Sequence, residues 1–427
     1  MTLAEKIISK KMGREVVAGE TVEVDVDIAM THDGTTPLTV KTFEKIADKV
    51  WNPEKVVIVF DHNIPANTSK AANMQVLTRN FVNEQGIKNY YKGGEGICHQ
   101  LLPEKGHVLP NTVIAGGDSH TCTHGAFGAF ATGFGATDMG YIYAMGKTWL
   151  KVPETIRVEV SGVNERIYGK DIILKTCKEI GRSGATYMAL EYGGNAVKNL
   201  DMDDRMTLSN MAIEMGGKTG LIEADDTTYE YLALAGVNSS KIAELKKERL
   251  TSDYYDEKIQ NDAYHGVLEF DITDMEEQVA CPHHPDNVTD VSNIKGLEIN
   301  QVFIGSCTNG KINDLRVAAK YLKNNEVHRN VRLIVIPASK AIFNQAIAEG
   351  LINTFVDAGA MICTPGCGPC LGAHQGVLGD GEVALSTTNR NFKGRMGNLN
   401  SDVYLSSPAV AAMSAIKGYI TNEHEKY

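Results

Sequence analysis

Short runs of apolar, largely β-branched residues alternate along the chain with longer amphipathic stretches. These runs predict strands at 56–60, 112–116, 155–160, 301–306 and 332–337. Apolar runs of this length are typical of strands in parallel sheets, because helices cover both faces of such sheets and bury every side chain. The pattern therefore predicts an α/β fold of layered helices and mainly parallel strands.

Polar loops rich in histidine, aspartate and cysteine follow three of these strands. DHNIPAN follows the first strand, GGDSHTCTHG follows the second, and SCTNG follows the run that begins at 301. Sheets of this class bind their ligands beyond the carboxyl ends of the strands. The three loops are therefore the first place to look for a functional site.

Two irregular stretches divide the chain into segments of similar length. Pro153 precedes the strand at 155–160, and the proline-broken polar stretch 281–296 lacks any periodicity. A length of 427 residues fits about three domains at roughly 100–200 residues each. We expect domains at 1–153, 154–290 and 291–427.

The overall charge narrows the class of protein. The chain has 42 Lys and Arg against 53 Asp and Glu, for a net charge of -11. This balance argues against binding nucleic acid through bulk electrostatics.

The first sixteen or so residues place charges in every turn and lack the apolar core of a signal peptide, and no apolar stretch is long enough for a membrane anchor. We expect a cytoplasmic protein that binds neither membrane nor nucleic acid.

The cysteines predict a metal site. Eight cysteines are too few for a disulfide scaffold of a chain this long, but Cys363, Cys367 and Cys370 fall within eight residues. Cys367 and Cys370 have the C-x-x-C spacing that lets two thiolates bind one centre. Cys307 lies sixty residues upstream in the motif IGSCTNG.

The residues alone leave three metal sites open. Cys363 and His374 could complete a tetrahedral zinc site with the C-x-x-C pair. The three clustered cysteines also have the C-x3-C-x2-C spacing of radical S-adenosylmethionine enzymes. In the third arrangement, Cys307 joins Cys367 and Cys370 to hold an iron–sulfur cluster with one iron free of protein ligands, which can act as a Lewis acid.

Five ordered motifs, DHNIPAN, GGDSHTCTHGAFGAFATGFGATD, IGSCTNG, CGPCLGAHQG and STTNRNFKGRMGN, resemble those of the aconitase superfamily. Within it, the chain is similar to the archaeal type of the large subunits of 3-isopropylmalate dehydratase and homoaconitase, from THDGTTP to the last helix. The resemblance implies three α/β/α domains around a 4Fe-4S cluster that Cys307, Cys367 and Cys370 hold, with one open iron. It also implies a hydro-lyase that dehydrates a 2-hydroxy di- or tricarboxylate and rehydrates it at the next carbon.

The resemblance also assigns roles to residues in these motifs. Asp61 and His62 form the acid pair that protonates the leaving hydroxyl. The other residues with an expected catalytic role surround the bound water and substrate in the pocket. They are His99, Asp118, Ser119, His120 and Glu214. The expected substrate-binding residues are His32, Arg390 and Arg395. Asn210 and Asn389 are expected beside the cluster.

One part of the family's site is missing from the sequence. The resemblance implies a catalytic serine in a Gly-Ser-Ser-Arg motif on a fourth, swivelling domain, and this chain has no such motif. We therefore expect a separate small subunit that carries the swivel domain and the serine, in a heterodimer or heterotetramer.

The expected activity is the isomerisation of 2-isopropylmalate to 3-isopropylmalate in leucine biosynthesis. The alternatives are a homoaconitase that acts on homocitrate and homoaconitate, and a citramalate or dimethylmalate dehydratase, because substrate selection in this family lies mostly on the small subunit. A zinc-binding or RNA-binding protein without enzymatic activity is the remote alternative.

Overall fold

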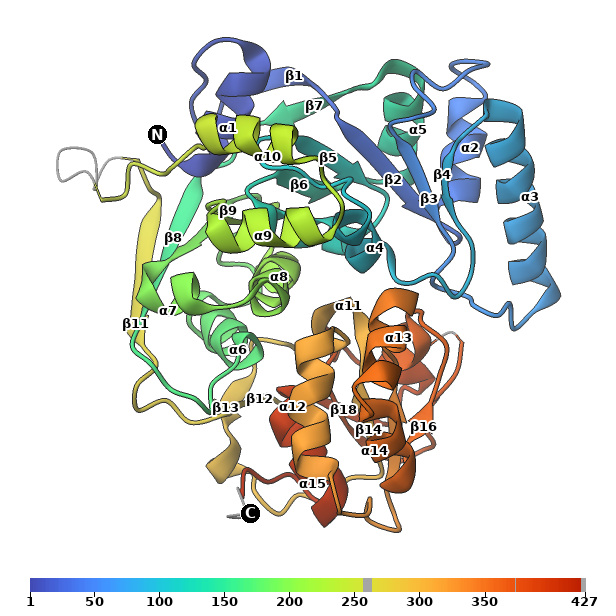
Figure 1. The fold of residues 1–427 in the computed structure, drawn as a ribbon, viewed down its shortest axis with the longest axis vertical. Coiled ribbons are helices and arrows are strands. Elements are labelled where there is room, and N and C mark those ends of the chain that lie inside the picture. The colour runs from blue at the N-terminus through green and yellow to red at the C-terminus, as the bar shows by residue number, and fades with distance from the viewer. Residues whose placement is uncertain (256–262, 373, 424–427) are drawn as a thin grey trace.

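The computed structural model describes residues 1–255, 263–372 and 374–423. Its described residues form three sheets of four or more strands and a separate two-stranded sheet, with helices around them (Figure 1), so the predicted α/β fold is confirmed. A strand forms in each predicted run: β3 (Val56–Val59), β5 (Val113–Gly116), β8 (Thr155–Ser161), β14 (Gln301–Ile304) and β15 (Arg332–Val335).

The first sheet has five parallel strands in the order β4-β3-β2-β5-β6. Its remaining strands are β2 (Ile28–His32), β4 (Asn89–Tyr91) and β6 (Phe130–Gly133). Alternate residues of β3 enter different cores: Val56 and Ile58 pack with the helices α2 (Thr36–Phe43), α3 (Ser69–Gln85) and α5 (Ala136–Met145), whereas Val57 and Val59 face α4 (Cys98–Glu104). Burial on both faces explains why the strand reads as a continuous apolar run.

The second sheet contains four parallel strands in the order β10-β9-β8-β11. The new strands are β9 (Ala189–Gly193), β10 (Thr219–Ile222) and β11 (Gly266–Asp271). The helices α6 (Gly169–Ile180), α7 (Gly194–Asn199) and α8 (Met202–Asn210) follow its strands in the chain. The helices α6 and α8 lie between this sheet and the third one (Figure 1).

The third sheet has seven strands in the order β13-β12-β18-β17-β14-β15-β16. Its core from β18 to β16 is parallel, and β12 and β13 extend it in antiparallel pairing. The strands not yet given are β12 (Gln278–Ala280), β13 (Val288–Asp290), β16 (Met361–Ile362), β17 (Val383–Ser386) and β18 (Asp402–Leu405). The segment 278–290, which precedes the expected third domain, is thus hydrogen-bonded into the third sheet.

The remaining elements connect and cover these sheets. They are α1 (Leu3–Met12), α9 (Asp226–Leu234), α10 (Ser239–Lys247), α11 (Ser306–Asn309), α12 (Ile312–Leu322), α13 (Lys340–Ala348), α14 (Leu351–Asp357), α15 (Pro408–Lys417), the two-stranded antiparallel sheet of β1 (Thr21–Asp25) and β7 (Lys147–Lys151), and the 3-10 helices η1 (Ser119–Phe127), η2 (Met211–Met215), η3 (Val291–Asn293), η4 (Gly368–Leu371) and η5 (Arg395–Gly397). No helix in the described part of the chain has the length and apolar character needed to cross a membrane.

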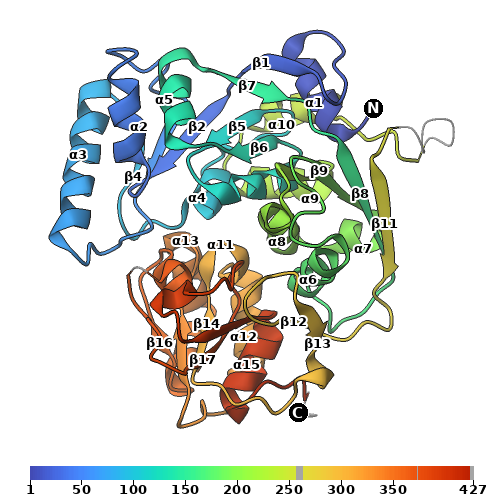
Figure 2. The ribbon, with the colours of Figure 1, turned by 180° about the vertical axis from the view of Figure 1, so that it is seen from behind.

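The strand β14 joins the two largest apolar cores of the protein. Val302 and Ile304 pack in the core shared with the first sheet, whereas Phe303 packs in the core shared with the second sheet. Seen from behind, the elements of the third sheet lie below both other sheets (Figure 2). The loop that follows β14 is therefore fixed where the three layers meet.

Candidate active site

The first part of the site is an aspartate–histidine pair in the loop after β3. The Nδ1 atom of His62 lies 2.6 Å from Oδ1 of Asp61. The other carboxylate oxygen of Asp61 accepts a hydrogen bond of 2.8 Å from the backbone N–H of Cys98, at the start of α4. Both side chains are largely buried, so the carboxylate fixes the imidazole with its Nε2 atom directed away from Asp61.

Asp33 holds this loop, and the sequence analysis did not select it. Its Oδ1 atom accepts a 2.9 Å hydrogen bond from the backbone N–H of His62, and its Oδ2 atom accepts one of 2.9 Å from Asn63. The ring of His32 stacks on that of His62 with the ring centres 3.7 Å apart. The position of Asp33 next to His32 in THDGTTP was the available signal, because aspartate often caps exposed backbone N–H groups in loops.

Asp118 is the carboxylate at which the histidines meet. Its Oδ1 atom lies 2.8 Å from Nε2 of His99 and accepts a 2.8 Å hydrogen bond from the backbone N–H of His120. Its Oδ2 atom lies 3.6 Å from Nε2 of His32 and 3.7 Å from Nε2 of His62. Burial opposes the charge of Asp118, but the charge of His99 and the hydrogen bonds from both neighbouring histidines outweigh it, so its pKa lies well below the usual range.

A second buried chain of contacts links η1, η2 and the loop after β17. The Nε2 atom of His120 lies 2.8 Å from Oε1 of Glu214, and Nε of Arg390 donates to the same carboxylate at 2.8 and 3.0 Å. Arg390 also donates to Oγ of Ser119 at 3.1 Å. Burial opposes ionisation of Glu214, but the hydrogen bond from His120 and the charge of Arg390 lower its pKa.

Three cysteines face these groups across one cavity of about 80 Å³. Cys307 comes from α11 after β14, and Cys367 and Cys370 come from the turn at η4. The lining also includes His62, His99, Asp118, Ser119, His120, Asn389, Arg390 and Arg395. The other predicted residues, His32, Asp61, Asn210 and Glu214, contact members of this lining directly.

The thiols of this cavity need a metal to stay ionised. Burial raises the pKa of Cys307 to about 11 and that of Cys367 to about 12. Both thiols therefore carry protons at neutral pH when no cation is bound, and a metal must displace those protons. A donor set of three thiolates with few competing oxygens suits soft metals, iron–sulfur clusters above all.

The geometry argues against the single-zinc arrangement. Zinc–sulfur bonds of about 2.3 Å bring tetrahedral thiolates within about 4 Å of one another. In the described part of the chain, the compact group of ligand atoms within 4.8 Å of one another consists of His32, Asp33, Asp61 and His62, and includes no cysteine. Cys363 and His374 also do not line the cavity, and Nε2 of His374 instead lies 2.6 Å from the carbonyl oxygen of Pro65.

Side-chain N–H groups point at the cysteine sulfurs. Asn210 donates to Sγ of Cys307 at 3.3 Å, and Asn389 donates to the same sulfur at 3.6 Å and to Oδ1 of Asn210 at 3.0 Å. Arg395 donates to Sγ of Cys370 at 3.5 Å. Such donors stabilise thiolate charge and orient metal ligands. The cavity residues therefore fit a cluster held by the three cysteines.

Two buried lysines, which the sequence analysis also missed, hold the loops that carry these groups. Lys170 of α6 donates to the carbonyl oxygens of Thr387 and Thr388 at 2.8 and 2.6 Å, directly before Asn389. Lys311 donates to Oγ1 of Thr207 at 3.1 Å and to the carbonyl oxygen of Thr308. Burying a charge is costly unless it is hydrogen-bonded, so these contacts fix the backbone next to Cys307 and Asn389.

Replacing Lys170 with methionine should lower the free energy of unfolding by about 1–3 kcal/mol, because two buried carbonyls lose their donor. Methionine keeps the length of the side chain without its charge. Urea denaturation measures the change. The matched control is Lys175→Met on the same helix, whose ammonium forms only a partly exposed ion pair with Glu179 and should contribute at most about 1 kcal/mol. Equal stability of the two variants would contradict the role of Lys170.

The fold brings three thiols that fit a metal centre, histidine–carboxylate pairs and two arginines together in one cavity. Comparison with known proteins agrees. The model of the aconitase family (aconitate hydratase) matches residues 5–297 and 292–418, and the chain belongs to this family of hydro-lyases. The family implies a 4Fe-4S cluster.

Relatives match over nearly the full chain. The methanogen homoaconitase large subunit of Methanocaldococcus jannaschii is 67% identical over 99% of this chain and 100% of that protein. A probable 3-isopropylmalate dehydratase large subunit of Methanothermobacter thermautotrophicus is 53% identical over 99% of this chain and 98% of its own length. The 3-isopropylmalate dehydratase large subunit 1 of Methanopyrus kandleri is 51% identical over the same shares of the two chains.

Proposed function

We propose that the chain is the cluster-bearing large subunit of a hydro-lyase that moves a hydroxyl group between adjacent carbons of a 2-hydroxy di- or tricarboxylate. The observation that supports it most is that three thiols, the Asp118 carboxylate with its histidines, and two arginines line one cavity. Cys307, Cys367 and Cys370 would hold the 4Fe-4S cluster. With three thiolate ligands the cluster keeps one iron open, which supplies Lewis-acid assistance to departure of the hydroxyl.

The histidine–carboxylate pairs would move the protons. Asp61 holds Nδ1 of His62, so the proton that can be transferred sits on Nε2 at the cavity wall. Asp118 holds His99 in the same way from the other side of the cavity. A carboxylate that orients an imidazole and stabilises its charged form is the usual arrangement for general acid catalysis. These pairs would protonate the leaving hydroxyl and return the proton on rehydration.

The two arginines would have different tasks. Arg390 is held by Glu214 and Ser119, so its guanidinium is already engaged in the cavity wall. The Nε atom of Arg395 is buried and has no hydrogen-bond partner among the described residues. A buried guanidinium N–H without a partner is costly unless a ligand accepts from it. We therefore assign Arg395 as the main carboxylate-binding residue, with Arg390 and His32 completing the substrate-binding wall.

The site as proposed lacks a base that takes the proton from carbon. We propose that a small subunit supplies it through a serine on a swivel domain, and that domains 1–153, 154–290 and 291–427 of this chain form the rest of the site. The names of the relatives support a partner, because each is called a large subunit.

Dehydration should require both subunits. The reconstituted chain with a 4Fe-4S cluster should show no turnover alone and full turnover when the small subunit is added, because the base is missing. Absorbance of the unsaturated intermediate acid measures the reaction. Turnover by the cluster-loaded chain without a partner would contradict the proposal.

The relatives support two candidate substrates. The higher identity to the methanogen homoaconitase large subunit favours homocitrate and homoaconitate, and the several 3-isopropylmalate dehydratase relatives support 2-isopropylmalate. Assaying the complete enzyme with homoaconitate, 2-isopropylmalate and citraconate side by side separates these substrates by their kcat/KM values.

A further inference from the structure

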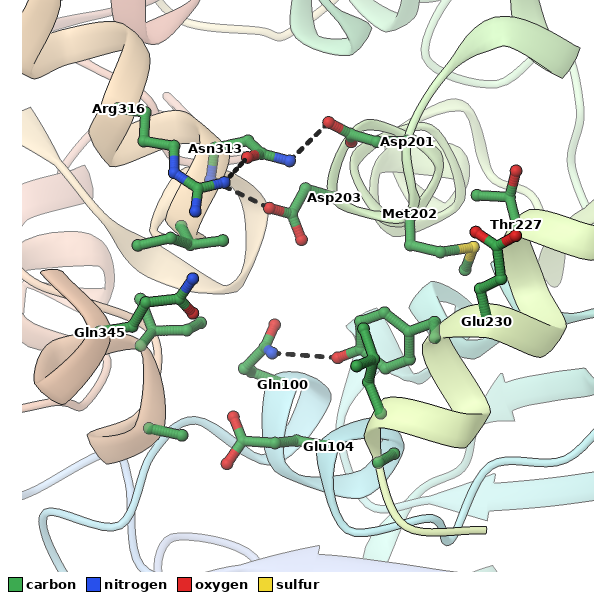
Figure 3. A pocket seen from close by; sticks show the side chains of 16 residues that line it. Gln100, Glu104, Asp201, Met202, Asp203, Thr227, Glu230, Asn313, Arg316 and Gln345 are labelled. Atoms are coloured by element: carbon green, nitrogen blue, oxygen red, sulfur yellow. Dashed lines mark hydrogen bonds between the residues drawn. The ribbon is translucent and has the colours of Figure 1, made fainter. Parts of the chain in front are cut away.

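A second and larger cavity lies on the other side of α4 from the candidate active site. It has a volume of about 420 Å³ and opens between α4, α8 and α9 on one side and α12 and α13 on the other (Figure 3). Its apolar wall includes Met202, Tyr231, Leu234, Ile312 and Ile342. A largely apolar pocket of this size with a few polar groups is the usual form of a small-molecule site.

Most of the charged groups of this cavity are carboxylates. Glu104, Asp201, Asp203 and Glu230 line it, whereas Arg316 is the one cation among the described lining residues. The charge of Arg316 is already balanced by Glu349, which does not line the cavity. In the described part of the chain, neither Asp203 nor Glu230 forms a salt bridge.

One buried polar atom in the wall lacks the partner that a ligand would supply. Gln100 is 4% exposed, and its Nε2 atom donates to the hydroxyl of Tyr231 at 3.3 Å. Its Oε1 atom is buried without a hydrogen-bond partner among the described residues, and the close-up shows this side chain pointing into the cavity (Figure 3). Asp203 is also buried, and burial raises its pKa to about 7 although it accepts from the backbone N–H of Asn313.

We propose that this cavity binds a small organic cation, an ammonium group on an apolar chain. The ammonium donates to the buried oxygen of Gln100 and pairs with Asp203, while the chain lies against Tyr231 and Leu234. Glu230, across the cavity beside Thr227 (Figure 3), adds a second negative charge to its wall. The four carboxylates of the lining against one arginine disfavour an anion at this wall. The substrate of the catalytic cavity is anionic, so the two cavities select opposite charges.

The helix α4 contributes residues both to this cavity and to the candidate active site. Gln100 follows His99 directly in α4, and the two side chains enter different cavities. An organic cation bound there would therefore contact α4, which carries His99, without contacting the substrate. The binding claim itself does not depend on the proposed reaction, because binding is measured without turnover.

Calorimetric titration of the full chain with 1-aminohexane tests the proposal, with 1-hexanol and hexanoate as neutral and anionic matches of the same length. The cation should bind one per chain, and at least about tenfold more tightly than the alcohol, because only the ammonium pairs with the carboxylates. Hexanoate should not bind. Equal affinity for the amine and the alcohol would overturn the proposal.

Variants locate the binding. Asp203→Asn with Glu230→Gln should weaken 1-aminohexane at least about tenfold and leave 1-hexanol unchanged. Glu326→Gln, an exposed carboxylate outside the lining, should change neither. Ala341→Trp places a large side chain at an exposed position of the lining on α13 and should abolish binding while leaving the fold intact. Unchanged amine affinity in both cavity variants would overturn the assignment.

Discussion

Replacing Cys367 with serine is expected to remove both the cluster and the activity of the complete enzyme. Cys367 lies in the wall of the candidate active site with Cys307 and Cys370, and a cluster with only two thiolate ligands would not be retained. Lewis-acid assistance is worth several kcal/mol, so activity should fall by about 10³-fold or more. Iron and acid-labile sulfide per chain measure the loss of the cluster, and turnover measures the loss of activity.

The nearby Cys363 provides a matched control for this experiment. It lies four positions before Cys367, is only half-buried, and does not line the cavity. Cys363→Ser should keep full iron and sulfide content and full activity. A retained cluster in Cys367→Ser would contradict the ligand assignment. A loss of cluster in Cys363→Ser would also contradict it and would favour the arrangement built on the three clustered cysteines.

Replacing Asp118 with asparagine should reduce kcat by about 10²–10⁴-fold without loss of the cluster. Asp118 holds His99 through a 2.8 Å contact and lies near His32 and His62, so its carboxylate keeps these imidazoles in place. An asparagine side chain keeps the shape but carries no negative charge. The pH profile of kcat should change as well, because the acid–base network loses the negative charge at its centre.

The control for Asp118 is Asp138→Asn on α5, which removes one carboxylate outside the cavity lining. It should leave kcat, its pH profile and the iron content unchanged. If Asp118→Asn instead lost its iron, Asp118 would be a structural residue of the cluster site. If it kept its kcat, the histidine–carboxylate network would have no part in the reaction.

Much of the fold could be predicted from the sequence because its strands are buried on both faces. The run at 56–60 contributes alternate residues to two different cores, so it must be apolar throughout and is easily recognised. The loops of the site follow such strands, and their residues meet because β3 and β5 are both parallel neighbours of β2. Cys307 could be joined to Cys367 and Cys370 only through the resemblance to a family, since spacing alone allowed other partners.

The residues that the sequence analysis missed share a physical reason. Lys170 contacts the carbonyl of Thr387, which lies 217 positions away in the chain, and a single lysine in an amphipathic helix gives no sign that it is buried. The shortest hydrogen bonds of Asp33 come from the backbone N–H groups of His62 and Asn63, about thirty positions away, and the sequence does not reveal such backbone partners. The different tasks of Arg390 and Arg395 depend on Glu214, which only the fold brings to Arg390.

Iron and sulfide analysis of the anaerobically purified chain, followed by electron paramagnetic resonance during exposure to air, tests the central claim most directly. A cluster held by Cys307, Cys367 and Cys370 should give a 4Fe-4S centre that loses its one non-thiolate iron in air and then shows the signal of a three-iron cluster. Stoichiometric zinc without sulfide, or a four-iron cluster that air leaves intact, would contradict it.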